Sequence, residues 1–265
     1  MHEFPCFRPG RQTPGVPSLL VLGTSDSDGS HLDRREDAWP WLLAAALAAP
    51  GEPGPTVHKR FYATAPGALD YLERQLAATE PDIVVLSLTL YAFSVRTVAN
   101  RIRRVAGARA GAWAERQFNR FDRATGPTAA GMSGRPAGGH ALNRAAHRAA
   151  RTVIGTASEA GPREVLSAYT TAIERLAREE DVRVVVIGSF PFTVEIEREN
   201  PRGRDVQRAF NQRIARLCRE RRIGWVDPEF MRDRDVDSLY TDALHFTEAS
   251  HSRVAAEVSA VLSDS

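Results

Sequence analysis

The sequence predicts an α/β fold in which a doubly wound parallel sheet of five strands is covered by helices. Two observations predict it. Short apolar runs alternate with amphipathic helical segments along most of the chain, which is the pattern of repeated strand–helix units. Two of these runs, IVVLSL at 83–88 and VRVVVIG at 182–188, are almost continuously apolar and rich in β-branched residues. Runs of this kind are typical of central parallel strands that are buried on both faces.

The elements follow in order along the chain. Residues 1–17 carry several Pro and Gly residues and are expected to form a flexible arm. Strands are expected at Leu19–Leu22, Thr56–Tyr62, Ile83–Leu88, Val182–Ile187 and Gly224–Val226. Helices are expected at about 66–79, 93–121, 140–156, 162–179, 203–221 and 247–263. Pro66 and Pro162 suit first-turn positions, and Thr247 suits an N-cap.

One connection is too long for a simple crossover. Roughly ninety residues separate the third and fourth strands, where about a dozen would suffice. We interpret residues 95–165 as a helical insertion within a single domain that spans 18–265. Two roles remain open for it: a lid beside the active site, or a packing elaboration that carries a disordered loop.

The bulk properties exclude several classes of protein. The net charge of +2 creates no strong field for nucleic acid or a membrane surface. Cys6 and Cys218 are too few for a disulfide framework or a zinc site, and Cys218 is expected in the core. The N-terminus has no signal-peptide pattern, and the apolar stretch around 41–49 is too short to span a bilayer. We therefore expect a cytoplasmic protein with no membrane partner.

Three side chains suggest nucleophilic chemistry. Ser25 follows the first strand, and Asp242 and His245 stand three residues apart just before the last helix. A serine hydroxyl needs a neighbouring base to remove its proton, and a histidine can do this near neutral pH. An aspartate on the far ring nitrogen orients the imidazole. This set predicts a hydrolase of the serine-nucleophile class, although Ser25 alone would also suit a helix N-cap.

These residues resemble the motifs of the SGNH, or GDSL-type, hydrolases. GTSDSDG at 23–29 is similar to their GDSxxxG block, and DALH at 242–245 is similar to their DxxH block. The order of the motifs agrees as well. The resemblance implies a flavodoxin-like sheet, with Ser25 as nucleophile, His245 as general base and Asp242 as its orienting partner. It also implies that Ser25 contributes its N–H to the oxyanion hole, and that the enzyme needs neither a cofactor nor a metal.

The sequence departs from the family pattern around the oxyanion hole. Thr24 stands where the first block has Asp, and no clear counterpart of the second-block glycine is present. The third-block asparagine is also missing, so Thr89 or Tyr91 would have to donate to the oxyanion by its hydroxyl. The main hypothesis is hydrolysis or transfer of an acyl group of a small-molecule ester. The alternative is a catalytically impaired protein that binds a small ligand or serves as an acyltransferase partner in a biosynthetic pathway, with any carrier partner unknown.

Other residues near these motifs have two interpretations each. Phe190 and Phe192 at the end of the fourth strand would line an acyl pocket or pack in the core. Thr24 and Asp26 would contact substrate, although Asp26 would also suit a first-turn position that favours the helix dipole. His31 is expected on a surface helix. His251 with Asp242 matches no strong metal-binding motif.

Overall fold

A computed structural model describes residues 16–29, 31–62, 64, 67–94, 96–125, 152–231, 236–241 and 245–264. Its centre is one sheet of five parallel strands in the order β2-β1-β3-β6-β7. The strands are β1 Ser18–Gly23, β2 Thr56–Phe61, β3 Ile83–Ser87, β6 Arg183–Ile187 and β7 Gly224–Val226. The five predicted strands and the doubly wound, flavodoxin-like order are therefore confirmed. The predicted N-terminal arm lies almost wholly outside the described residues.

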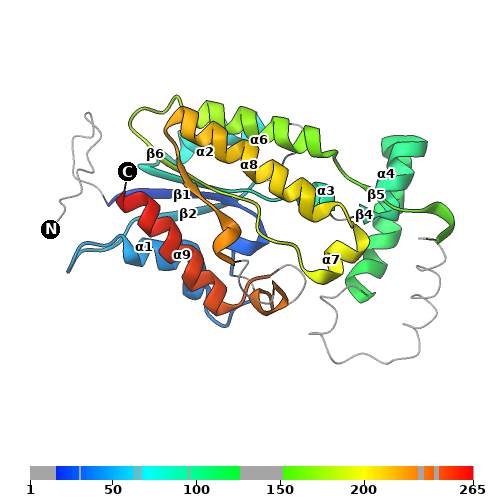
Figure 1. The fold of residues 1–265 in the computed structure, drawn as a ribbon, viewed down its shortest axis with the longest axis horizontal. Coiled ribbons are helices and arrows are strands. Elements are labelled where there is room, and N and C mark those ends of the chain that lie inside the picture. Colours follow the sequence, from blue (N-terminus) through cyan, green and yellow to red (C-terminus); the bar gives the residue numbers. More distant parts are fainter. Residues whose placement is uncertain are drawn as a thin grey trace.

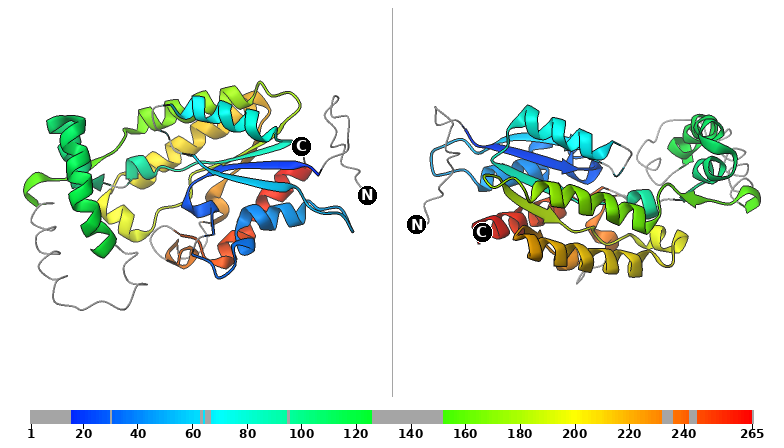
Figure 2. Two further views of the ribbon diagram at one scale, coloured as in Figure 1. Left: turned by 180° about the vertical axis from the view of Figure 1, so that it is seen from behind. Right: turned by 90° about the horizontal axis from the view of Figure 1, so that it is seen from above.

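Helices cover both faces of the sheet (Figures 1 and 2). One face carries α2 Ala68–Thr79, α6 Pro162–Leu176 and α8 Gly203–Arg221. The other carries α1 Trp39–Ala46 and α9 Glu248–Ser263. Two local predictions about helix starts hold: Pro162 is in the first turn of α6, and the Thr247 hydroxyl caps α9 by accepting from Ser250 N–H.

The strands supply the core on both faces because successive side chains of a strand point to opposite sides. In β1, Leu20 and Leu22 pack toward the α2, α6 and α8 side. Leu19 and Val21 pack toward α1 and α9. All four are fully buried. Cys218 of α8 is fully buried too, as expected for a small core residue.

Helix α1 was not predicted. Its sequence, WPWLLAAA, is apolar at every position, so it shows no alternation of polar and apolar residues that would reveal a helical period. The helix is nevertheless well placed, since Trp39 and Leu43 are fully buried against the sheet and α9. Within the described ranges, none of the helices combines the length and the apolar character that crossing a membrane requires.

The predicted insertion is partly described. It begins with a two-residue strand, β4 Arg96–Thr97, which pairs with β5 Ala157–Ser158 in antiparallel fashion. Between them α4 Val98–Thr125 is interrupted at Gly107, where φ is 87°. Figures 1 and 2 place α4 beyond α3 Tyr91–Ser94 and α7 Val194–Glu199, at the end of the molecule where the strands of the sheet terminate. The predicted helix at 140–156 lies mostly outside the described residues.

Candidate active site

A tight turn presents Ser25 at the carboxyl edge of the sheet. Strand β1 ends at Gly23, and a single 3-10 turn, Ser25–Ser27, follows. The Ser27 hydroxyl donates to the Thr24 carbonyl over 2.7 Å, and this hydrogen bond stabilises the turn. Only glycine fits at position 23, because a Cβ there would lie 2.5 Å from Ser27 Oγ. The N-cap of this turn is Thr24, so the Ser25 hydroxyl is not used as a cap.

The hydroxyl and the amide of Ser25 are available to a ligand. Neither its hydroxyl nor its amide makes a hydrogen bond to any part of the chain that the structure describes. The side chain is partly exposed and lines a pocket of about 80 Å³. A serine in this position can approach a ligand from the pocket, and its N–H can donate to the same ligand.

Asp26 fastens the turn to the sheet. Its Oδ1 accepts from both the amide and the hydroxyl of Thr24, over 3.1 and 2.6 Å. Its Oδ2 accepts from Ser87 Oγ, at the end of β3, over 3.1 Å. Burial raises the pKa of Asp26, and the hydrogen bonds from Thr24 and Ser87 oppose that shift. Asp26 therefore organises the turn from within while also lining the pocket.

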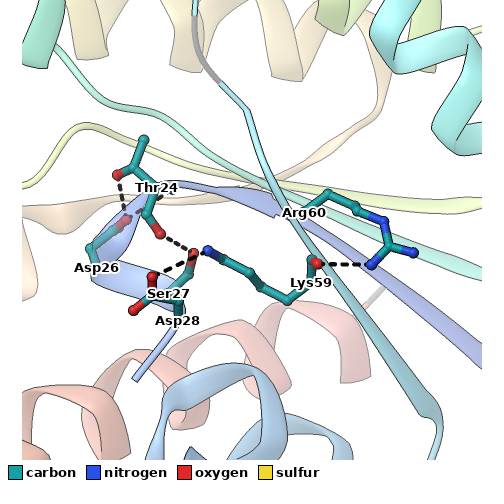
Figure 3. Close-up of polar contacts among 6 residues, drawn as sticks. All are labelled: Thr24, Asp26, Ser27, Asp28, Lys59 and Arg60. Atoms are coloured by element: carbon teal, nitrogen blue, oxygen red, sulfur yellow. Dashed lines mark hydrogen bonds and ion pairs between the residues drawn. The ribbon is translucent and has the colours of Figure 1, made fainter. Parts of the chain in front are cut away.

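A charged pair lies under the turn. Figure 3 shows Lys59 reaching from β2 toward it, where Nζ lies 3.7 Å from Asp28 Oδ2. Lys59 is the only lysine of the chain, and its side chain is 8% exposed. Burial lowers the pKa of Lys59, and the Asp28 carboxylate opposes that shift. The pair links β2 to the turn that carries the serine.

The pocket collects most of the side chains that the sequence singled out. Thr24, Asp26, Thr89, Tyr91, Phe190 and Phe192 all line it beside Ser25. Both phenylalanines are also 8% exposed and pack in the core, so core packing is confirmed for both, and their contact with an acyl group stays a prediction. The sequence did not identify the other residues that line the pocket. These are Leu88, Ser94, Ser189, Pro191, Thr193, Ile196, Tyr240 and Phe246.

Of the two expected hydroxyl donors, Thr89 is the better placed. Its amide donates to Tyr169 Oη over 3.1 Å, which fixes the backbone. Its Oγ1 accepts from the Tyr91 amide over 3.2 Å. That bond occupies a lone pair of the hydroxyl and leaves its proton available to an oxygen in the pocket. Tyr91 also lines the pocket, but it is 47% exposed, and Thr89 is the residue whose amide and hydroxyl oxygen are both fixed by neighbours.

His245 lies at the start of the segment that enters α9. It is partly buried, and its carbonyl accepts from Thr241 N–H over 2.7 Å. Its ring is not among the pocket-lining groups, although the next residue, Phe246, is. Asp242 lies outside the described residues. The structure therefore brings Ser25 and Phe246, the residue after His245, to one pocket, and the catalytic roles of Ser25, His245 and Asp242 stay predictions.

The expectation for His31 was wrong. His31 lies in a turn rather than a helix, and its ring contacts His245 and His251 with centroid separations of 4.8 and 5.5 Å. No local sequence pattern could have revealed this contact, because more than two hundred residues separate His31 from both partners. Within the described ranges, no group of three or more His, Cys, Asp or Glu side chains could hold a metal ion.

Comparisons with known proteins agree with this architecture. The sequence profile of the GDSL-like lipase/acylhydrolase family matches residues 21–253. A comparison with curated proteins gives no match. The structure resembles the lipase/acylhydrolase from Enterococcus faecalis, with a TM-score of 0.55 and 14% identity over 93% of this chain and 96% of that one.

Two further solved structures share the fold. TesA matches with a TM-score of 0.53 and 17% identity, over 93% of this chain and 98% of its own. Axe2, an acetylxylan esterase from Geobacillus stearothermophilus, matches with a TM-score of 0.52 and 13% identity, over 93% and 95%. At these identities the structural likeness establishes the fold, and the profile establishes the family. The chain belongs to the GDSL-like lipase/acylhydrolase family.

Proposed function

We propose that the protein is an ester hydrolase in which Ser25 is the nucleophile, His245 the general base and Asp242 its orienting partner. The observation that carries the proposal is Ser25 itself: a serine at the carboxyl edge of a parallel sheet that lines a pocket, and whose hydroxyl and amide make no hydrogen bond to the described residues. Family membership supports ester chemistry. Phe246 lines the same pocket and brings the His245 segment to the serine.

The proposed roles define the reaction. Ser25 Oγ attacks the ester carbonyl while His245 takes the hydroxyl proton, and a tetrahedral oxyanion forms. The Ser25 amide and the Thr89 hydroxyl donate to that oxyanion. The intermediate expels the alcohol, which receives the proton from His245. A water molecule then attacks the acyl-serine, with His245 again as base, and releases the carboxylic acid.

The pocket favours a small acyl group. Its volume of about 80 Å³ is roughly half of the cavity that accommodates a benzene ring. Phe190, Phe192 and Phe246 give the pocket aromatic surface, and Phe190 and Phe246 contact each other edge-to-face with ring centroids 4.7 Å apart. An acyl chain of a few carbons fits such a space, whereas a long chain would have to extend into solvent.

Replacement of the nucleophile tests the proposal. In Ser25→Ala, kcat for 4-nitrophenyl acetate should fall by at least about 10⁴-fold, because the acyl-enzyme of the proposed reaction forms on the Ser25 hydroxyl. Covalent labelling by a fluorophosphonate should be lost as well. Ser27→Ala is the matched control: its hydroxyl faces the Thr24 carbonyl rather than the pocket, so labelling should persist. Folded wild-type protein that neither turns over the ester nor reacts with the probe would refute the proposal.

A further inference from the structure

A stack of three imidazole rings lies beside the proposed active site. His31 contacts His245 on one side, with ring centroids 4.8 Å apart and planes inclined by 35°. It contacts His251 with centroids 5.5 Å apart and planes inclined by 24°. Both separations fall in the range in which aromatic rings attract one another. His31 is thus the ring that joins the other two.

A hydrogen bond ties His31 to the backbone just after His245. His31 Nε2 lies 2.7 Å from the Phe246 carbonyl, and because a carbonyl can only accept, the ring donates. The Thr241 hydroxyl donates to the same carbonyl over 3.3 Å. Nδ1 of His31 is buried and has no partner among the described residues, so this carbonyl is the polar anchor of the ring.

The far end of the stack is rigid. His251, in the first turn of α9, is fully buried, and its Nδ1 accepts from the Trp39 amide of α1 over 3.3 Å. Burial lowers the pKa of His251 to about 4, so this ring is neutral under ordinary conditions and adds no charge to the stack. His31 therefore contacts a buried, uncharged ring and also contacts His245.

We propose that His31 is a positioning residue for His245: it fixes the ring by stacking and fixes the adjoining backbone through the Phe246 carbonyl. The inference rests on the proposed function, in which His245 must point a ring nitrogen at the Ser25 hydroxyl. His31 touches neither substrate nor serine in this role. It acts by narrowing the range of orientations that the His245 ring can adopt.

Three substitutions of His31 test separately its ring contact with His245 and its hydrogen bond to the Phe246 carbonyl. His31→Ala removes both, His31→Phe keeps a ring without a donor, and His31→Gln keeps an N–H without a ring. His31→Ala should lower kcat by up to about 100-fold, since misplacing a catalytic group by about 1 Å can cost that much. KM should change by less than about two-fold, because His31 itself is not among the pocket-lining residues. His31→Gln and His31→Phe should each recover part of the loss.

His58→Ala is the matched control, because His58 is a partly exposed histidine of β2, and it should leave kcat unchanged. Full kcat in His31→Ala, with Ser25 still labelled by the fluorophosphonate, would overturn the positioning role while leaving the proposed function intact. So would a loss in His31→Ala that neither partial variant recovers, since that result would indicate general damage to the fold.

A second readout does not depend on turnover. The ring-proton resonance of His245 in NMR spectra should shift in His31→Ala, because the ring current of the stacked imidazole is removed, and should shift less in His31→Phe. If Ser25 proves unreactive but this resonance behaves as described, the proposed function fails and the contact itself stands. An unchanged resonance in His31→Ala would contradict the stack and the proposal built on it.

Discussion

Thr89 is the residue that we propose in place of the missing third-block asparagine. Its amide is held by Tyr169, and its hydroxyl oxygen is held by the Tyr91 amide, so the side chain has one defined rotation. The O–H of Thr89 must point away from the Tyr91 amide, and Thr89 lines the pocket. A short side chain fixed in this way can deliver one oxyanion hydrogen bond, which is the contribution that the absent asparagine would make.

Removing that hydroxyl should slow the chemical step. Thr89→Val keeps the shape of the side chain, and kcat should fall by about 100- to 1,000-fold, the usual cost of one oxyanion donor. KM should change little, because the donor acts mainly in the transition state. Thr89→Ser keeps the hydroxyl and should retain most of the activity. Equal kcat values for wild type and Thr89→Val in steady-state assays would rule out this donor.

Local patterns predicted those site residues that follow strands. Ser25, Thr89 and Phe190 come directly after β1, β3 and β6, and the ends of parallel strands meet at one edge of the sheet. The sequence could not predict contacts made across the fold by residues without such a position. His31 depends on a contact with Phe246 that spans 215 residues, and Asp26 depends on the buried surroundings of its carboxylate.

At the scale of elements, α6 connects the core to the pocket. Tyr169 of α6 is fully buried, and its hydroxyl accepts the Thr89 amide just past the end of β3. Its ring packs against Tyr62 and Phe210 with centroid separations of 6.3 and 6.0 Å. The helix therefore sets the direction in which the chain leaves β3, and so the place of the Thr89 hydroxyl.

Tyr169→Phe should destabilise the fold and impair catalysis together. The Thr89 amide would lose its acceptor, which should lower the free energy of unfolding by about 1–3 kcal/mol in urea titrations. Steady-state assays should show a lower kcat, because Thr89 would be less firmly held. Tyr62→Phe is the control: this neighbour is also buried, but its hydroxyl accepts no main-chain amide among the described residues. If both variants lose equal stability, the Thr89 contact is not the cause.

Among the elements, those with a clear period or composition were predictable. Strands β3 and β6 were evident from their continuous apolar runs, and α9 from its cap at Thr247. Helix α1 was not, because a helix that is apolar all around has no polar face to reveal its period. The pair β4 and β5 is only two residues long in each strand, too short for any alternation to register.

At the scale of the whole molecule, a contact at His251 joins two helices that lie far apart in the sequence. Helix α9 packs on α1 across one face of the sheet (Figure 1). Their contact buries an imidazole that accepts a hydrogen bond from Trp39 in its neutral form. Nδ1 of His251 can accept this hydrogen bond only while it is unprotonated, so protonation of the ring opposes folding and links global stability to pH.

The sign of that link follows from the two pKa values. The pKa of His251 is lowered to about 4 in the folded protein, mainly by burial, and is about 6.5 in an unfolded chain. Between these values the unfolded chain binds more protons, so the free energy of unfolding falls as the pH falls. From about pH 7.5 to about pH 5, this one group should remove about 2 kcal/mol. Below about pH 4 nearly the whole destabilisation is present, and above about pH 7.5 almost none remains.

His251→Asn isolates this contribution, because the asparagine oxygen can replace Nδ1 as the acceptor for Trp39 N–H and does not titrate in this range. Urea denaturation at about pH 7.5 and about pH 5 should show that the variant loses about 2 kcal/mol less than wild type. Asp26 acts in the opposite direction, since its raised pKa favours the protonated folded state as the pH falls. It is present in both proteins, so its effect cancels in the difference. Equal losses in wild type and variant would mean that His251 is not the group that couples folding to pH.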